Sequence, residues 1–187
     1  MGGRATRASR RQRAVELRAP SVQLESEFLA ASRRSRSLHG SFARPPTTRV
    51  QFRAYLRRVR SAAHEGHFVI ERETDRLVGV INLNDIVRGS FQNAHLGYYA
   101  FPPFSGRGYM TAGLSAVLRR AFGELGLHRL EANIQPDNQD SIRLVRRLGF
   151  REEGLSPRYL KVGGRWCDHA RWALLAEEWR PGRVARP

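Results

Sequence analysis

The chain is poor in cysteine, in lysine and in acidic residues. Cys167 is the only cysteine, which excludes an internal disulfide and suits a reducing compartment, so we expect a cytoplasmic protein. No apolar run approaches the roughly 20 residues that a membrane-spanning helix needs. The start, MGGRATRASRRQR, lacks the apolar segment of a secretory signal. It is arginine-rich and acid-free, as mitochondrial transit peptides are, but a disordered basic tail over 1–12 is the simpler expectation. The histidines show no zinc-ligand spacing, so we expect no metal.

The scarcity of acids leaves a strongly basic chain. Lys+Arg number 33 and Asp+Glu 17, giving a net charge of +16, and every basic residue except Lys161 is an arginine. Codon bias in a GC-rich genome would explain this excess of arginine. A partner made of phosphates would explain it too, because the guanidinium group binds phosphate in a bidentate fork.

Hydrophobic periodicity predicts a single domain over 13–179, followed by a Pro/Gly/Arg tail over 180–187. Strands are expected at 12–18, 67–73, 77–85, 94–101, 128–135, 158–162 and 165–175, and helices at 21–35, 49–63, 108–125 and 137–150. The segments 37–46 and 87–93 are expected to be loops. The fold class is therefore α/β (α+β), with a three-stranded antiparallel meander followed by a parallel β-α-β crossover across 94–135.

The helix expected at 49–63 carries two distinct faces. Thr48 is its expected N-cap, as Ser21 is for the helix before it. Its predicted buried face consists of Phe52, Tyr55, Leu56, Val59 and Ala63. A separate stripe consists of Arg49, Arg53, Arg57 and Arg60. This stripe fits either an ordinary solvated face or a docking surface for an acidic partner.

A glycine-rich turn, PFSGRGYMTAGL (103–114), runs directly into a predicted helix. Uncovered backbone N–H groups and the positive end of the helix dipole make such a turn an anion site. A Walker A loop is excluded because no lysine follows Gly108. A dinucleotide fingerprint is disfavoured because Thr111 fills the position of the third glycine and no acidic residue ends a strand about 20 residues further on.

The turn instead resembles the acyl-CoA loop of GNAT-type acetyltransferases, [QR]-x-x-G-x-[GA]. Other stretches narrow the resemblance: VRGSF, HLGY, GRGYMTAGL, HRLEANIQPDNQDSIRL, RLGFREEG and a terminal G-x-W-x-D-H are similar to RimJ-type ribosomal-protein-alanine N-acetyltransferases. The similarity covers about 13–180, more loosely over 20–63. It implies the GNAT fold, a mixed, mostly antiparallel sheet of six or seven strands with a splayed central parallel pair and four helices. It also implies transfer of acetyl from acetyl-CoA to the N-terminal amine of a ribosomal protein.

The resemblance also implies where the cofactor binds. The CoA pyrophosphate is expected on the turn formed by Ser105, Gly106, Arg107, Gly108, Tyr109 and Met110. The pantetheine arm is expected along Tyr98, Tyr99 and Ala100, with further contacts from Asn133 and Asn138. A backbone N–H of this strand, assigned to Tyr99, would polarise the thioester carbonyl, and Ser141 would protonate the leaving thiolate. For Asn138 an N-cap role, and for Ser141 a solvent-facing position, are the simpler alternatives.

The acceptor side is less determined. Tyr159, Trp166 and Asp168 are the expected acceptor contacts, although both aromatics also fit a core role. Glu131, Glu152, Glu153 and Asp168 are candidate bases, and none is compelling. A strong base is less necessary for an α-amine, whose pKa is about 7.7–8.0, than for lysine at about 10.4. Cys167 and His169 are an unconvincing nucleophilic pair, because catalytic groups usually converge from different elements.

Three functions remain open within this reading. The first is acetylation of a ribosomal protein N-terminus, which the basic surface would help to approach near rRNA. The second is acetylation of a small amine such as a polyamine or an antibiotic, which the net charge disfavours. The third is a CoA-binding or ribosome-assembly factor with little turnover. We expect a monomer or a homodimer and no membrane partner.

Overall fold

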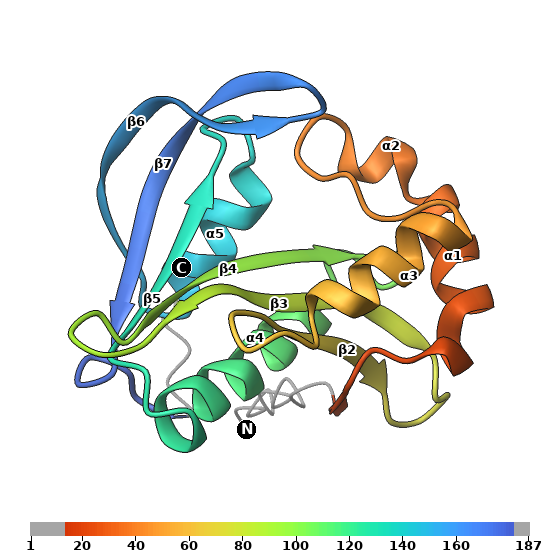
Figure 1. The fold of residues 1–187 in the computed structure, drawn as a ribbon, viewed down its shortest axis with the longest axis horizontal. Helices are drawn as coiled ribbons and strands as arrows, with labels where there is room; N and C mark the ends of the chain where they lie inside the picture. Colours follow the sequence, from red (N-terminus) through yellow and green to blue (C-terminus); the bar gives the residue numbers. More distant parts are fainter. Residues whose placement is uncertain (1–13, 182–187) are drawn as a thin grey trace, which may run out of the picture.

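A seven-stranded sheet in the order β1-β2-β3-β4-β5-β7-β6 organises the protein, seen here in a computed structural model that describes residues 14–181 (Figure 1). The strands are β1 (Val15–Arg18), β2 (Glu65–Glu71), β3 (Leu77–Val87), β4 (Asn93–Ala100), β5 (Arg129–Ile134), β6 (Arg151–Val162) and β7 (Arg165–Leu175). The helices are α1 (Glu25–Arg34), α2 (Arg36–His39), α3 (Arg49–Arg58), α4 (Tyr109–Arg119) and α5 (Gln139–Arg147). The predicted order of elements is confirmed, with the short α2 as an addition.

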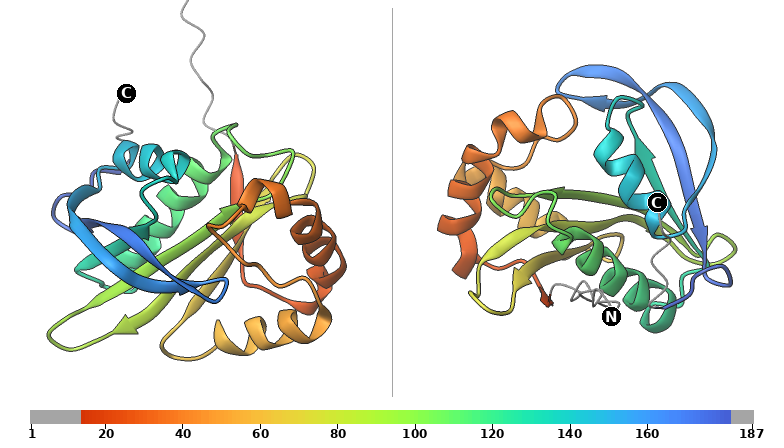
Figure 2. Two further views of the ribbon diagram at one scale, coloured as in Figure 1. Left: turned by 90° about the horizontal axis from the view of Figure 1, so that it is seen from above. Right: turned by 180° about the vertical axis from the view of Figure 1, so that it is seen from behind.

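Side chains that alternate along the strands build one core on each face of the sheet. In β2, Phe68 and Ile70 join a cluster with Phe28 of α1 and Phe52 of α3, whereas Val69 joins the cluster beneath α4. The ring centroids of Phe28 and Phe52 lie 4.8 Å apart. Helices α1 and α3 therefore cover one face of β2–β4 and α4 covers the other (Figure 2).

The sheet splits between its two parallel strands. β4 pairs with β5 only from Asn93 opposite Arg129 to Leu96 opposite Ala132. Beyond these residues the strands diverge, and β5 continues with β7 and β6 as the second arm of a V (Figure 1). The glycine turn follows β4 and α5 follows β5, so both predicted cofactor elements begin at the open end of the V.

Three boundaries differ from expectation for physical reasons. The segment 37–46 begins with α2, which at four residues is too short to show a hydrophobic period. Helix α3 ends at Arg58, and Ala63, expected in the core, is exposed. Strand β6 begins at Arg151 rather than 158, because it is exposed along nearly its whole length and lacks the alternation that marks a half-buried strand.

Two helix termini have distinct chemistry. Thr48 caps α3 in a capping box with Gln51, as its position in the sequence predicts. Ser21 precedes a single 3-10 turn, Val22–Leu24, and its side chain makes no capping bond, so α1 begins only at Glu25.

No helix in the described range is long and apolar enough to cross a bilayer. The tail expected over 1–12 lies outside the described residues, as does all of the tail expected over 180–187 except residues 180 and 181.

Candidate active site

The glycine turn at the open end of the V is shaped to receive an anion. Gly106 and Gly108 have φ values of 72° and 88°, and Gly108 is the N-cap of α4. A Cβ added to either glycine would meet no atom within 4 Å, so the space beside the turn is open. The backbone N–H groups of Gly106, Gly108 and Met110 donate to no residue between 14 and 181. Together with the dipole of α4, these N–H groups form a site that fits a pyrophosphate.

A cavity of about 360 Å³ runs from this turn along the diverging end of β4. Most of the residues expected to bind the cofactor line it, namely Tyr98, Tyr99, Ala100, Ser105, Gly106, Gly108, Met110 and Asn138, together with Ser141. A cradle for phosphate thus continues into a channel along a strand that β5 no longer covers. The residues present fit CoA, whose pantetheine arm is peptide-like.

A second cavity, of about 780 Å³, lies on the other side of the same opening. Phe42, Ala43, Tyr98, Tyr99, Asn138 and Ser141 line both cavities, so the two spaces meet at these residues. Tyr159 lines only the second cavity. The first space has room for a cofactor and the second for an acceptor, and reacting atoms would meet at the junction. We call the first the cofactor cavity and the second the acceptor cavity.

The remaining expected residues lie elsewhere around the opening. Arg107 is exposed beside the turn and lines neither cavity. The side chain of Tyr109 is buried, with its hydroxyl on Glu71, so only its backbone faces the turn. Asn133 lines the second cavity rather than the cofactor side. Trp166 is 61% exposed on the β6–β7 hairpin, which excludes a core role.

Asp168, the last expected acceptor contact, has a structural partner. Its Oδ1 accepts a hydrogen bond of 2.7 Å from the backbone N–H of Arg158, where β6 departs from regular pairing with β7. Arg158 has a φ of 49° at this irregularity. Asp168 itself lines neither cavity. Its carboxylate therefore shapes the strand that carries Tyr159 into the acceptor cavity.

Asn138, Ser141 and Tyr98 form the polar junction between the cavities. Oδ1 of Asn138 accepts the backbone N–H of Ser141 at 3.2 Å, so Asn138 is the N-cap of α5. Its side-chain NH₂ group donates to no described residue. Burial raises the pKa of Tyr98 to about 12, and the neighbouring Ser141 hydroxyl opposes this shift. Tyr98 therefore stays protonated at neutral pH, and no hydrogen bond joins its buried hydroxyl to a described residue.

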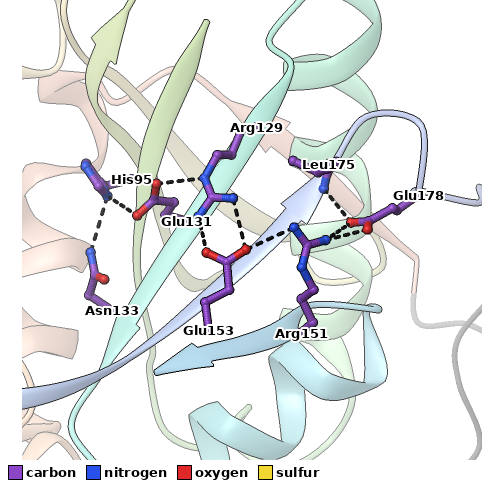
Figure 3. Close-up of polar contacts among 8 residues, drawn as sticks. All are labelled: His95, Arg129, Glu131, Asn133, Arg151, Glu153, Leu175 and Glu178. Atoms are coloured by element: carbon purple, nitrogen blue, oxygen red, sulfur yellow. Dashed lines mark hydrogen bonds and ion pairs between the residues drawn. The ribbon is translucent and has the colours of Figure 1, made fainter. Parts of the chain in front are cut away.

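Three of the four acidic candidates for a base, Glu131, Glu152 and Glu153, are engaged in ion pairs, and Figure 3 shows those of Glu131 and Glu153. Glu131 Oε1 lies 2.8 Å from Nε of Arg129, which also pairs with Glu153. Arg129 lowers the pKa of Glu153, and Arg151 continues the chain of charges from Glu153 to Glu178. Glu152 lies 3.4 Å from Arg146. These contacts give Glu131, Glu152 and Glu153 structural partners and leave them poorly placed as bases.

Several residues of the site have no sequence signal strong enough to identify them. His39 of α2 lines the cofactor cavity, and its Nε2 lies 2.8 Å from the carbonyl oxygen of Ala100. Arg143 and Arg147 of α5 line the same cavity. Their i, i+4 spacing places both on one face of α5, beside Leu144, and this spacing is the one available signal.

Comparison with known proteins agrees with this geometry. Residues 15–151 match the family model of the acetyltransferase (GNAT) domain. An Escherichia coli [ribosomal protein uS5]-alanine N-acetyltransferase is 38% identical over 123 residues, 66% of this chain and 62% of that relative. The match thus spans less than two thirds of the relative's length.

Solved structures share the whole architecture. Mycobacterium smegmatis RimJ in complex with CoA-disulfide aligns with a TM-score of 0.75 and 28% identity, covering 88% of this chain and 83% of that one. A Vibrio cholerae spermidine N-acetyltransferase in complex with CoA and spermine aligns with a TM-score of 0.75 at 20% identity, covering 88% and 96%, and at that identity shows the fold alone. The chain therefore belongs to the GNAT family of N-acetyltransferases.

Proposed function

We propose that the protein transfers acetyl from acetyl-CoA to the N-terminal α-amine of a protein, an Ala or Ser terminus of a small-subunit ribosomal protein. The relative from E. coli named above, a uS5-alanine N-acetyltransferase, supports this acceptor. The CoA-disulfide bound to M. smegmatis RimJ supports the cofactor. The open turn at Gly106 and Gly108 would hold the pyrophosphate, and Arg143 and Arg147 add positive charge to the same cavity.

The proposed reaction takes place where the two cavities meet. The amine nitrogen attacks the thioester carbonyl carbon, the C–N bond forms and the C–S bond breaks. A backbone N–H of β4, assigned to Tyr99, would stabilise the oxyanion, and Ser141, beside Tyr98, would supply a proton to the sulfur. The α-amine suits this site because a substantial fraction of it is neutral near pH 7.7–8.0.

The observation that carries the acceptor class is the charge of the acceptor cavity. Asp85 is the only carboxylate among the described residues that line it, and they also include Arg58, His64, His95 and His169. A polyamine carries several positive charges and needs several acidic partners, because an unpaired cation is costly to desolvate. A protein N-terminus brings a single amine and an extended backbone. The cavity therefore favours the N-terminal acceptor.

The surface beside the cavity supports a substrate surrounded by RNA. Arg49, Arg53, Arg57 and Arg60 are all exposed along or just beyond α3. Arg49 and Arg53 lie 2.8 and 3.8 Å from Glu25, while Arg57 has no ion-pair partner among the described residues. The stripe retains positive charge available for phosphate contacts.

The proposal is tested by incubating the protein with acetyl-CoA and peptides that begin with Ala, Ser or Met, with spermidine as the rival acceptor. Each peptide should also contain an internal lysine, and mass spectrometry should locate the acetyl group. We expect acetyl on the α-amine of the Ala and Ser peptides. A peptide with a blocked N-terminus should remain unmodified. Transfer to spermidine in preference to the peptides would contradict the proposal.

A further inference from the structure

His169 is a buried histidine that the reaction described above does not use. It lies on β7, is 3% exposed, and lines the acceptor cavity together with Ser141 and Tyr98. In the sequence its neighbour Cys167 is an unconvincing nucleophilic partner, and in the structure Cys167 contacts it through the backbone. The backbone carbonyl oxygen of Cys167 lies 2.9 Å from Nδ1 of His169.

This contact determines which ring nitrogen carries the proton. A carbonyl oxygen only accepts hydrogen bonds, so Nδ1 of His169 must be the donor. The neutral imidazole therefore holds its lone pair on Nε2. No residue in the described part of the chain hydrogen-bonds to Nε2. Protonation of Nε2 leaves the bond from Nδ1 intact, so the ring is held in one orientation in both of its charge states.

The strand register places His169 level with the expected oxyanion donor. The last parallel pair is Leu96 of β4 and Ala132 of β5. Two residues further along, Tyr98 is level with Ile134, which pairs with Ala170 of the antiparallel β7. One more residue in the same direction brings Tyr99 level with His169, on the opposite side of the split. Alternation along β4, β5 and β7 also puts their side chains on the same face of the sheet.

The histidine of β4, His95, is less well placed than His169 of β7. His95 lies on the same face, four residues before Tyr99, which is about 13 Å along an extended strand. Its Nδ1 lies 3.2 Å from the amide nitrogen of Asn133 and 3.9 Å from Glu131, as Figure 3 shows. His95 is thus tied to the network of ion pairs, away from the junction of the two cavities.

We propose that His169 is the proton acceptor for the incoming amine. As nitrogen attacks the thioester carbon, its surplus proton passes to Nε2, directly or through one water. The sulfur takes its proton from Ser141, and the imidazolium returns its proton to the serine, directly or through solvent. Amine and thioester thereby become amide and thiol with no other reactant. This assignment rests on the proposed N-terminal acceptor, whose single amine must lose one proton.

Other titratable and charged groups surround His169, and a pH–rate experiment must distinguish their effects from those of His169. Tyr159 of β6 contacts its ring, with centroids 6.4 Å apart, and Asp168 is its neighbour on β7. The far walls of the cavity carry Arg58 of α3, His64 before β2, Asp85 of β3 and His95 of β4. His95→Gln is therefore the matched control, since it removes a histidine from the same cavity and face.

Activity should be measured on the Ala peptide for His169→Gln and His95→Gln, with acetyl-CoA affinity by calorimetry. Loss of a general base should lower kcat of His169→Gln by about 10²-fold or more and remove the limb of the pH–rate profile that it controls. His95→Gln should keep kcat within about threefold of the unchanged protein, although its KM for the peptide can rise because His95 lines the acceptor cavity. Both variants should bind acetyl-CoA normally. A large loss in His95→Gln but not in His169→Gln would overturn the proposal.

Two further measurements distinguish a catalytic role of His169 from a structural one. They also test this role independently of which acceptor is used. Added imidazole should restore activity to His169→Ala, which leaves a space of its size, but not to His95→Ala; no recovery in His169→Ala counts against the assignment. Nitrogen NMR of the unchanged protein should show the neutral ring protonated on Nδ1, and protonation on Nε2 would overturn it without any substrate. If only spermidine is acetylated, the proposed acceptor fails, and the same variants measured on spermidine still decide the role of His169.

Discussion

The carboxylate of Asp168 accepts the backbone N–H of Arg158 at 2.7 Å, and this bond links β7 to the irregular stretch of β6. Arg158 takes a φ of 49° there, a conformation that costs a non-glycine residue energy and persists only where its neighbours hold it. Tyr159 follows directly and enters the acceptor cavity, and His169 adjoins Asp168. One hydrogen bond thus positions side chains on both strands of the hairpin.

This bond predicts a difference between two substitutions of Asp168. Asp168→Asn retains an oxygen that accepts the Arg158 N–H, whereas Asp168→Ala leaves that donor without its partner. We expect Asp168→Ala to lower the free energy of unfolding by about 1 kcal/mol and to reduce turnover, with Asp168→Asn close to the unchanged protein. Urea unfolding and peptide acetylation measure the two effects. Equal behaviour of both variants would show that the carboxylate does not hold the strand.

The glycine turn predicts a loss of cofactor binding with little loss of fold. Gly108→Asp would place a carboxylate in the open space beside the turn, where the pyrophosphate is expected. Gly89→Asp is the matched control, because Gly89 also has a positive φ, of 68°, and open space at its Cβ, but lines neither cavity. We expect calorimetry to show strongly weakened binding of acetyl-CoA for Gly108→Asp alone. If Gly89→Asp weakens binding as much, the turn is not the phosphate site.

A substitution of Ser141 should distinguish its effect on turnover from its effect on acetyl-CoA binding. Its backbone N–H, not its hydroxyl, makes the capping bond with Asn138, so Ser141→Ala keeps α5 capped. Removing the expected proton donor should lower kcat by about 10²-fold while acetyl-CoA affinity changes little. Asn138→Ala should act differently, lowering both stability and cofactor affinity, because the N-cap is lost. Unchanged turnover in Ser141→Ala would remove the hydroxyl from the mechanism.

The arginine stripe predicts an effect that depends on the size of the substrate. Arg57→Glu should weaken acetylation of a ribosomal protein within an assembled particle, and the loss should shrink as salt rises. A free peptide should be acetylated as before. Arg119→Glu is the control, with the same change in charge at an exposed site on α4 across the sheet. Equal losses on the particle and the peptide would show that the stripe does not dock the substrate.

How much of this was predictable from sequence depends on whether a residue's signal is local. The glycine turn, the cap at Asn138 and the buried face of Phe52, Tyr55 and Leu56 follow from short-range rules, and the structure contains each of them. The resemblance to RimJ-type enzymes is confirmed by the family model and the relatives. The roles of individual site residues stay predictions.

Features that depend on long-range packing gave no such signal. His39 reaches Ala100 across 61 residues, and nothing in its neighbourhood, RSLHG, marks that contact. Asn133 was expected beside the cofactor, but its strand turns it toward His95 and the acceptor side. Only the split of the sheet between β4 and β5 decides which side such a residue serves, and periodicity does not encode that split.

The acid stability of the protein should depend on Glu65. The adjacent His67 ring and the Arg120 guanidinium lower the pKa of Glu65 to about 2. A carboxylate with a lowered pKa contributes stability above its ordinary pKa, near 4.5, and this stability is lost as pH falls toward 2. Glu65→Gln should therefore be less stable at pH 7, by about 2 kcal/mol.

The same reasoning predicts how the variant responds to acid. Since Gln does not titrate, Glu65→Gln should lose less further stability than the unchanged protein between pH 4.5 and 2. Glu124→Gln is the control, because Glu124 pairs with the same Arg120 but its side chain is 65% exposed and such pairs contribute little. Thermal unfolding followed across this pH range measures both variants. Parallel curves for Glu65→Gln and the unchanged protein would show that Glu65 is not ionised against its partners in the folded state.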